Sequence, residues 1–266
     1  MASGPGAREG DRRVLRDRGD APPALLPVGG RRKLPNTKNY YGTLSKRTAA
    51  ARREGTFPDL LDRTSRIEQH EFFSGPDEAR DYLRDIYRRD RTEGQEWTIH
   101  LGVEKDGLSL QLDSWFTDPL GIPHVALGGF ASQSLATAVR RNVIAQDRSA
   151  VLIYAGDFDP TGEDIPPRLR ETLRRLRQGG PRALLPEQVR EYHLPKNSDP
   201  KVQEKIERDP RAPAFRERHG SVFQIEVDAL APDVLRGLYQ AAIDDFWDED
   251  AYRSAFDRED LERDQL

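Results

Sequence analysis

The chain has 266 residues, with 42 Lys and Arg, 46 Asp and Glu, and no cysteine. The lack of cysteine excludes disulfides, zinc–thiolate sites, iron–sulfur clusters and cysteine nucleophiles. It fits the reducing environment of the cytoplasm, where we expect the protein. No apolar run approaches the roughly 20 residues that a membrane helix needs, so we expect no membrane partner.

Charge is unevenly distributed along the chain. Residues 1–53 contain 13 Lys and Arg but four Asp and Glu, a net charge of +9, and the remainder therefore carries −13. A basic arm on an acidic body can contact the phosphate backbone of a nucleic acid. A solvated, disordered basic tail explains residues 1–35 equally well, because they are rich in Gly, Pro and Arg and show no sustained apolar period.

Residues 36–92 show helical patterns. The spacing predicts a helix that begins at Asn36 and stops at Gly55 and Pro58. A second helix is expected to begin at Pro76 and to end near Arg91, since Pro suits the first helical turn. We interpret this region as a helical linker segment.

Strand and helix patterns alternate in the centre of the chain. A continuous apolar run, as in Ala150–Ala155, is typical of a strand buried on both faces. The alternation predicts an α/β fold with a parallel sheet flanked by helices, in which functional groups gather at the carboxyl ends of the strands. The expected elements are the strands 96–103, 123–127 and 150–155 and the helices 105–116, 132–146 and 163–178.

The last third of the chain is more polar. Residues 196–218 are expected to form a long loop or an irregular helix, followed by a strand at Ser221–Val227. Pro232–Phe246 is amphipathic and predicts a helix. Residues 246–266 are expected to form an acidic C-terminal tail.

Two carboxylates follow the most apolar strand directly. Asp157 and Asp159 are two positions apart, and the turn signalled by Pro160 and Gly162 is expected to leave them at the rim of the sheet. Such a pair is costly unless a cation lies between the carboxylates, and Mg²⁺ is typically bound by one or two carboxylates with phosphate oxygens. An inert turn in which an aspartate caps a helix is the alternative.

Glu104 lies at the end of the first predicted strand. If the two strands are parallel, Glu104 meets Asp157 and Asp159 at the same edge of the sheet. Three converging carboxylates would form a metal site for phosphoryl transfer, with Glu104 as a metal ligand or a general acid or base.

At these residues the sequence resembles a Toprim domain, the fold shared by topoisomerases, primases and related nucleases. The signature of that family is a Glu after one strand and Asp-x-Asp after a later strand, which bind Mg²⁺. Glu104, Asp157 and Asp159 match it. The resemblance implies a Toprim-like domain over residues 93–245, with these three residues as catalytic residues and ligands of Mg²⁺ or Mn²⁺.

Flanking segments are similar to proteins related to the topoisomerase VI A subunit. Leu34–Ile67 resembles the segment that joins a winged-helix domain to Toprim, and residues 183–188 and 226–230 resemble bacterial and phage members of the group. The resemblance covers about residues 34–245. It implies that residues 36–92 are a partial winged-helix segment.

One feature departs from that family. Its members cut DNA with a winged-helix tyrosine, but residues 1–33 contain no tyrosine. Tyr40 and Tyr41 lie in the following segment, where the resemblance implies a packing role. The departure shifts the expectation from tyrosine transesterification to metal-dependent hydrolysis or to an inactive descendant.

Several other charged residues could have either a functional or a purely structural role. Lys105 could neutralise a phosphate, or it could extend its charged end into solvent from the start of a helix. Glu163 could join the metal ligands, or it could simply interact favourably with the helix dipole in the first helical turn. Glu226 and Asp228 share a face of the last predicted strand. They could act near the metal, or they could be solvated groups at the end of the strand. Those four form the candidate outer shell of the site. Three arginines of the first helical segment are candidate DNA-backbone contacts, although a solvated helix face also explains them: Arg47, Arg52 and Arg53.

These features together predict a Mg²⁺- or Mn²⁺-dependent DNA-processing enzyme that cleaves phosphodiester bonds with little base specificity. The alternative is a catalytically inactive Toprim-like module that binds DNA or a protein partner. A primase-like polymerase is a third hypothesis. DNA is the expected partner in the first, and whether the chain forms a homodimer stays open.

Overall fold

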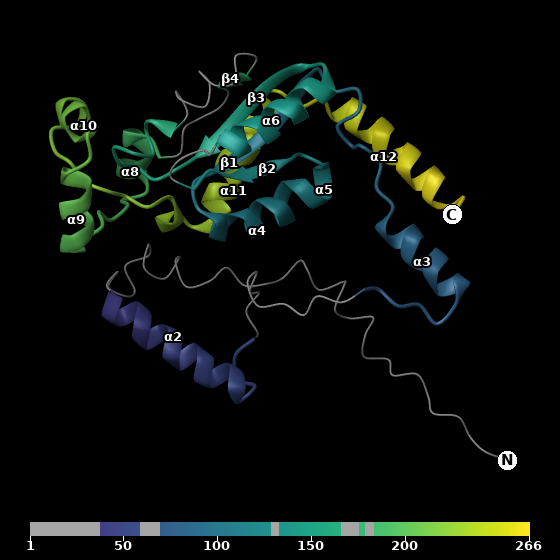
Figure 1. Cartoon of the computed structure of the whole chain (residues 1–266), viewed down its shortest axis with the longest axis horizontal. Helices are drawn as coiled ribbons and strands as arrows, with labels where there is room; N and C mark the ends of the chain where they lie inside the picture. Colours follow the sequence, from purple (N-terminus) through teal and green to yellow (C-terminus); the bar gives the residue numbers. More distant parts are fainter. Residues whose placement is uncertain (1–37, 59–69, 129–132, 166–175, 179–183) are drawn as a thin grey trace.

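A computed structural model describes residues 38–58, 70–128, 133–165, 176–178 and 184–266 (Figure 1). The strands are β1 (Trp97–Val103), β2 (His124–Ala126), β3 (Ser149–Ala155) and β4 (Leu176–Gln178). The helices are α2 (Lys38–Arg53), α3 (Pro76–Ile86), α4 (Ser109–Leu112), α5 (Asp118–Leu120), α6 (Gln133–Gln146), α8 (Pro186–Glu191), α9 (Pro200–Glu207), α10 (Ala212–His219), α11 (Pro232–Asp244) and α12 (Glu249–Arg263).

The centre of the fold is a four-stranded sheet in the order β2-β1-β3-β4, with every pairing parallel. β1 and β3 pair along their whole length, from Trp97 opposite Ser149 to Val103 opposite Ala155. The predicted α/β fold with a parallel sheet flanked by helices is confirmed. Because β1 and β3 end at the same level, the residues that follow them leave the same edge of the sheet.

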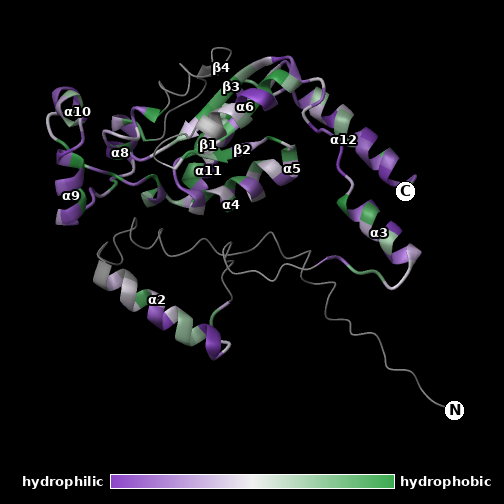
Figure 2. Cartoon of the chain, viewed as in Figure 1, coloured by the Kyte–Doolittle hydropathy of each residue, from purple (hydrophilic) through white to green (hydrophobic). Residues whose placement is uncertain are grey.

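Side-chain alternation along β1 and β3 builds a core on each face of the sheet. Leu101 and Ile153 face the larger core, which is covered by α11 and by the helical stretch around α4. Leu152 and Tyr154 face the smaller core, which α6 covers. Figure 2 shows the hydrophobic residues gathered on the strands and α11, whereas α9 and α12 are largely hydrophilic. β3 is thus buried on both faces, as its apolar run predicts.

The segment predicted as a helix over residues 105–116 is helical but changes its helix type along its length. It consists of a 3₁₀ turn at Asp106–Leu108, α4, a π-helical turn at Asp113–Thr117 and α5. The apolar side chains Leu108, Leu112 and Phe116 are all buried in the larger core. A regular pattern of i, i+4, i+8 drifts around an ideal helix, and the π turn keeps these three side chains on one side.

After β3, one predicted strand is wrong, and one predicted helix is wrong at its end. The strand predicted at Ser221–Val227 pairs only through an isolated antiparallel bridge between Phe158 and Ile225, and the chain enters a 3₁₀ turn at Val227. This segment crosses the loop after β3 instead of extending the sheet. The last three residues of the helix predicted at 163–178 form a strand instead, since Leu176–Gln178 is β4. Residues 166–175 of that prediction lie outside the described residues.

Segments expected to be irregular are helical. The region 196–218 contains α9, whose N-cap Asp199 accepts a hydrogen bond from Lys201 N, and α10, which ends at Gly220 with a φ of 76°. The segment expected to be an acidic tail contains α12, capped by Asp248. In the described part of the chain, no helix is long and apolar enough to cross a membrane.

Candidate metal and phosphate site

Glu104 and Asp157 meet at the carboxyl edge of β1 and β3. The backbone N–H of Glu104 donates to Ala155 O at 3.2 Å, and the backbone N–H of Asp157 donates to Glu104 Oε2 at 2.9 Å. The structure therefore brings together the two segments that the parallel arrangement predicts to meet. The Glu104 carboxylate is fixed by the backbone of the loop that carries both aspartates.

Asp157 and Asp159 are 5% and 4% exposed, and the backbone holds one oxygen of each. Asp157 Oδ1 accepts a hydrogen bond from Val227 N at 2.9 Å. Asp159 Oδ1 accepts from the N–H groups of Thr161 and Gly162, both at 2.8 Å, so it caps the turn after β3. The capping alternative for this segment therefore applies to Asp159, and capping occupies one of its two carboxylate oxygens.

Gly162 is required by the close packing of this loop. A Cβ at this position would lie 2.0 Å from the backbone oxygen of Asp157 and 3.3 Å from Glu104 Oε2. Real Cβ atoms do not approach a backbone oxygen so closely, so any larger residue would push the loop away from Glu104. The glycine thus allows the two acidic segments to be adjacent.

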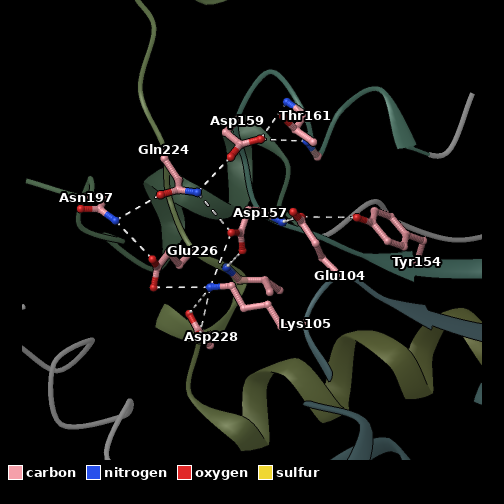
Figure 3. A network of polar contacts seen from close by, with 12 residues as sticks. Glu104, Lys105, Tyr154, Asp157, Asp159, Thr161, Asn197, Gln224, Glu226 and Asp228 are labelled. Atoms are coloured by element: carbon pink, nitrogen blue, oxygen red, sulfur yellow. Dashed lines mark hydrogen bonds and ion pairs between the residues drawn. The ribbon is translucent and has the colours of Figure 1, made fainter. Parts of the chain in front are cut away.

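Lys105 supplies a cation beside the carboxylates (Figure 3). Its Nζ lies 3.3 Å from both carboxylate oxygens of Asp228 and 3.5 Å from Asp157 Oδ2 and from Glu226 Oε2. Burial lowers the pKa of Lys105, but the three carboxylates outweigh this effect and raise the pKa above its usual value. Lys105 is therefore a fixed positive charge that connects the candidate ligand Asp157 to Glu226 and Asp228.

The site still carries an excess of negative charge. Burial raises the pKa of Asp157 to about 7, against the opposing effect of Lys105 and with a further contribution from Glu104. Burial also raises the pKa of Glu104, which the N–H of Asp157 opposes and Asp159 reinforces. The pKa of Glu226 is raised too, again by burial, with Lys105 opposing it. A cation placed among these groups would favour their ionised forms.

Two amide side chains complete the network, and neither was identified from the sequence. Gln224 Nε2 donates to Asp159 Oδ2 at 2.9 Å and to Asp157 Oδ2 at 3.4 Å. Asn197 Nδ2 donates to Gln224 Oε1 at 3.1 Å and to Glu226 Oε1 at 3.2 Å (Figure 3). In the sequence, Gln224 lies two residues before Glu226, which indicates that the two side chains share a face of the predicted strand. This spacing does not identify the carboxylates that Gln224 contacts.

Glu163 points to a different set of partners. It accepts hydrogen bonds from Arg218 Nη2 at 2.6 Å and from His219 Nε2 at 2.8 Å. These residues belong to the end of α10, so Glu163 fastens the loop after β3 to that helix. Of the four candidate outer-shell residues, Lys105, Glu226 and Asp228 join the network around Asp157, and Glu163 bonds elsewhere.

Three arginines predicted to contact DNA lie on α2. Arg47 and Arg53 are exposed and Arg52 is half-buried, and the sequence of α2 contains no acidic residue. Within the described residues, no ion pair joins them to the carboxylates around Asp157. They are basic residues of α2 and are not members of the carboxylate network.

The donor set fits a hard divalent cation in its chemistry. Every candidate ligand offers carboxylate oxygen, the donor that Mg²⁺ prefers. Among the described residues, no group of three His, Cys, Asp or Glu side chains is arranged to hold a metal ion. The two aspartate Oδ2 atoms converge instead on Gln224 Nε2. Comparison of the chain with protein-family models and with curated proteins finds no match.

Proposed function

We propose that this protein is a Mg²⁺- or Mn²⁺-dependent DNA-processing enzyme that cleaves phosphodiester bonds, with a Toprim-like α/β domain related to that of the topoisomerase VI A subunit. The observation that carries the proposal is the meeting of Glu104 with the Asp157 loop at the carboxyl edge of two adjacent parallel strands. Ligand sites of parallel α/β sheets form at such edges.

Glu104, Asp157 and Asp159 would hold the cation. It would supply Lewis acidity at a phosphate oxygen and stabilise the leaving oxygen when bound. The protein prepares the aspartates by holding Oδ1 of each with backbone N–H groups, which directs both Oδ2 atoms to one side. Lys105 offsets part of the charge around Asp157.

The basic helix α2 supports DNA as the substrate. Arg47, Arg52 and Arg53 would contact the phosphate backbone, which carries no base identity, so cleavage with little sequence preference is expected. Residues 54–266 carry a net negative charge, so the basic helix α2 is better suited than they are to contact a polyanion.

The test is nicking of supercoiled plasmid with Mg²⁺ or Mn²⁺ by the wild type and by the double variant Asp157→Ala, Asp159→Ala. We expect the double variant to lose cleavage. The matched control is Glu163→Gln, a carboxylate of the same loop that bonds to Arg218 and His219 and should leave nicking intact. Unchanged cleavage by the double variant would assign the activity to another part of the protein.

A specific observation favours the alternative of an inactive DNA- or partner-binding module. Lys105 and Gln224 already neutralise or bridge Asp157 within the protein. DNA binding that persists in EDTA, together with no cleavage by the wild type in either metal, would support this alternative.

A further inference from the structure

The side chain of Gln224 lies at the point where the two aspartates converge. Its single nitrogen Nε2 donates to Asp159 Oδ2 at 2.9 Å and to Asp157 Oδ2 at 3.4 Å (Figure 3). Both aspartates are almost fully buried. Two buried carboxylates repel each other, and an amide NH₂ with its two N–H donors relieves that repulsion only partly, because it carries no net charge.

The hydrogen-bond network fixes the orientation of this amide. Gln224 Oε1 accepts from Asn197 Nδ2 at 3.1 Å, and the same nitrogen donates to Glu226 Oε1 at 3.2 Å. Asn197 Oδ1 accepts from Asp199 N at 3.0 Å, so the Asn197 amide is itself oriented. Since Asn197 Nδ2 donates to Gln224 Oε1, the NH₂ group of Gln224 must face the aspartates.

The amide and a divalent cation would compete for the same oxygens. Backbone N–H groups hold Oδ1 of Asp157 and of Asp159, so a ligand would meet Oδ2 of each. Oδ2 of Asp157 also lies 3.5 Å from Lys105 Nζ. Mg²⁺ binds oxygen at about 2.1 Å, which is much shorter than an N–H···O distance. A cation held by the two Oδ2 atoms would therefore come too close to Gln224 Nε2 and its hydrogens, and the amide would have to move.

We propose that Gln224 is a positioning residue that bridges Asp157 and Asp159 in the ion-free protein and withdraws when a divalent cation binds the pair. This inference rests on the proposed function for the identity of the ion. The bridge keeps the two Oδ2 atoms facing each other without a metal. The cost of displacing it lowers the metal affinity of the site, so the site fills only when free Mg²⁺ or Mn²⁺ is abundant.

The test is Gln224→Glu, which keeps the size of the side chain and replaces the donor with a third carboxylate. Without metal the new carboxylate faces Asp157 and Asp159, so the melting temperature in EDTA should fall. A cation relieves this repulsion, so the variant should bind Mn²⁺ alone about tenfold more tightly than the wild type in isothermal titration. Mn²⁺ should also raise its melting temperature by more than that of the wild type.

Gln240→Glu is the matched control, because Gln240 Nε2 donates to a single carboxylate, Asp244, on α11. It should bind Mn²⁺ with the wild-type dissociation constant. A second variant, Gln224→Met, removes the donor without adding charge. Its melting temperature should fall in EDTA and approach that of the wild type in saturating Mn²⁺, because the cation replaces the lost bridge.

The outcomes separate this inference from the proposed function. If Gln224→Glu matches Gln240→Glu in EDTA and in Mn²⁺ affinity, Gln224 does not bridge the aspartates and the inference is wrong, whereas the proposed metal-dependent activity stands. If the wild type binds no Mn²⁺, the metal-dependent function fails, and withdrawal of Gln224 on metal binding fails with it. Altered Mn²⁺ affinity without DNA cleavage would support the inference and contradict only the nuclease proposal.

Discussion

The backbone N–H of Asp157 donates a 2.9 Å hydrogen bond to Oε2 of Glu104, 53 positions earlier in the chain. This bond joins the residue that follows β1 to the loop that follows β3. It holds one oxygen of Glu104 against the backbone and so orients the carboxylate toward the aspartates. The bond needs an acceptor but not a charge, which allows the structural and chemical roles of Glu104 to be separated.

Glu104→Gln should therefore abolish activity and preserve the fold. The glutamine oxygen can accept the hydrogen bond of Asp157 N, but the variant lacks the charge that a cation or a proton transfer needs. We expect Mg²⁺-dependent nicking to fall by about a hundredfold or more, with a melting temperature in EDTA close to that of the wild type. Wild-type nicking by this variant would contradict the proposed role of Glu104.

The raised pKa of Asp157 predicts how stability without metal depends on pH. The pKa is about 7 in the folded protein, against an ordinary value of 3.8 for an aspartate. The unfolded chain therefore loses its proton first, and stability that is present below about pH 4 is lost as the pH rises toward 7. Asp157→Asn keeps an oxygen acceptor for Val227 N and removes this titration.

In EDTA, Asp157→Asn should be more stable than the wild type at about pH 8, by an amount on the order of 2 kcal/mol, and the difference should shrink at about pH 5. Urea unfolding at several pH values measures it. With saturating Mg²⁺ the order should reverse, because the cation stabilises only the protein that keeps its carboxylate. A difference that does not change with pH would show that burial of Asp157 does not shift its titration.

Lys105 should be important for stability because it faces three carboxylates. It is 34% exposed and lies within 3.5 Å of Asp157, Glu226 and Asp228. Lys105→Met retains most of the apolar stem and removes the charge. Its free energy of unfolding in EDTA should fall by about 1–2 kcal/mol at neutral pH. The loss should decrease toward about pH 5, where Asp157, with its pKa raised to about 7, is protonated.

The control for this change is Lys201→Met, an exposed lysine in the first turn of α9. It should leave the free energy of unfolding within about 0.5 kcal/mol of the wild type. Equal effects of the two lysine variants would mean that the charge of Lys105 contributes no more than an ordinary surface charge.

DNA binding should depend on the basic helix more than on the carboxylates. Replacing Arg47, Arg52 and Arg53 with alanine removes up to three phosphate contacts, so the slope of log K against log salt should become shallower by about 2–3. Fluorescence anisotropy with a duplex in EDTA measures this slope without cleavage. An unchanged slope would place the DNA contact on another surface.

The elements that could be predicted from the sequence are those in which local composition decides the structure. Val151–Ala155 is apolar at every position and could only be a buried strand or helix segment, and its length favours a strand. Parallel pairing then implies that Glu104 and Asp157 meet, since both follow strand ends. That step needs topology alone and no knowledge of side-chain packing.

The rest of the network depends on contacts that no local pattern encodes. The sequence pattern predicts a strand at Gln224, yet its segment crosses the loop after β3, because Phe158 and Ile225 pair there. Asn197 belongs to a polar stretch whose composition favours a loop, and its bonds to Gln224 and Glu226 depend on tertiary placement. Polar residues of this kind look the same in sequence whether they face solvent or a buried carboxylate.

α12 illustrates the same limit, because its charged composition conceals a buried ion pair. Glu259 is 0% exposed, although its helix was expected to be an acidic tail. Arg91 Nη2 donates to Glu259 Oε1 at 2.6 Å and Arg91 Nε donates to Oε2 at 3.0 Å, and Arg91 Nη1 also reaches Pro119 O at 2.7 Å. This paired, bidentate geometry ties α12 to the end of α5.

Glu259→Ala should therefore cost about 3–5 kcal/mol of unfolding free energy, because it leaves the buried guanidinium of Arg91 unpaired. The control on the same helix is Glu249→Ala, which removes an exposed pair with Arg253 and should cost less than about 0.5 kcal/mol. Urea unfolding measures both. The double variant Arg91→Met, Glu259→Met should recover much of the loss, because neither charge is then buried alone. If the double variant is as unstable as Glu259→Ala, the unpaired Arg91 charge is not the cause of the loss.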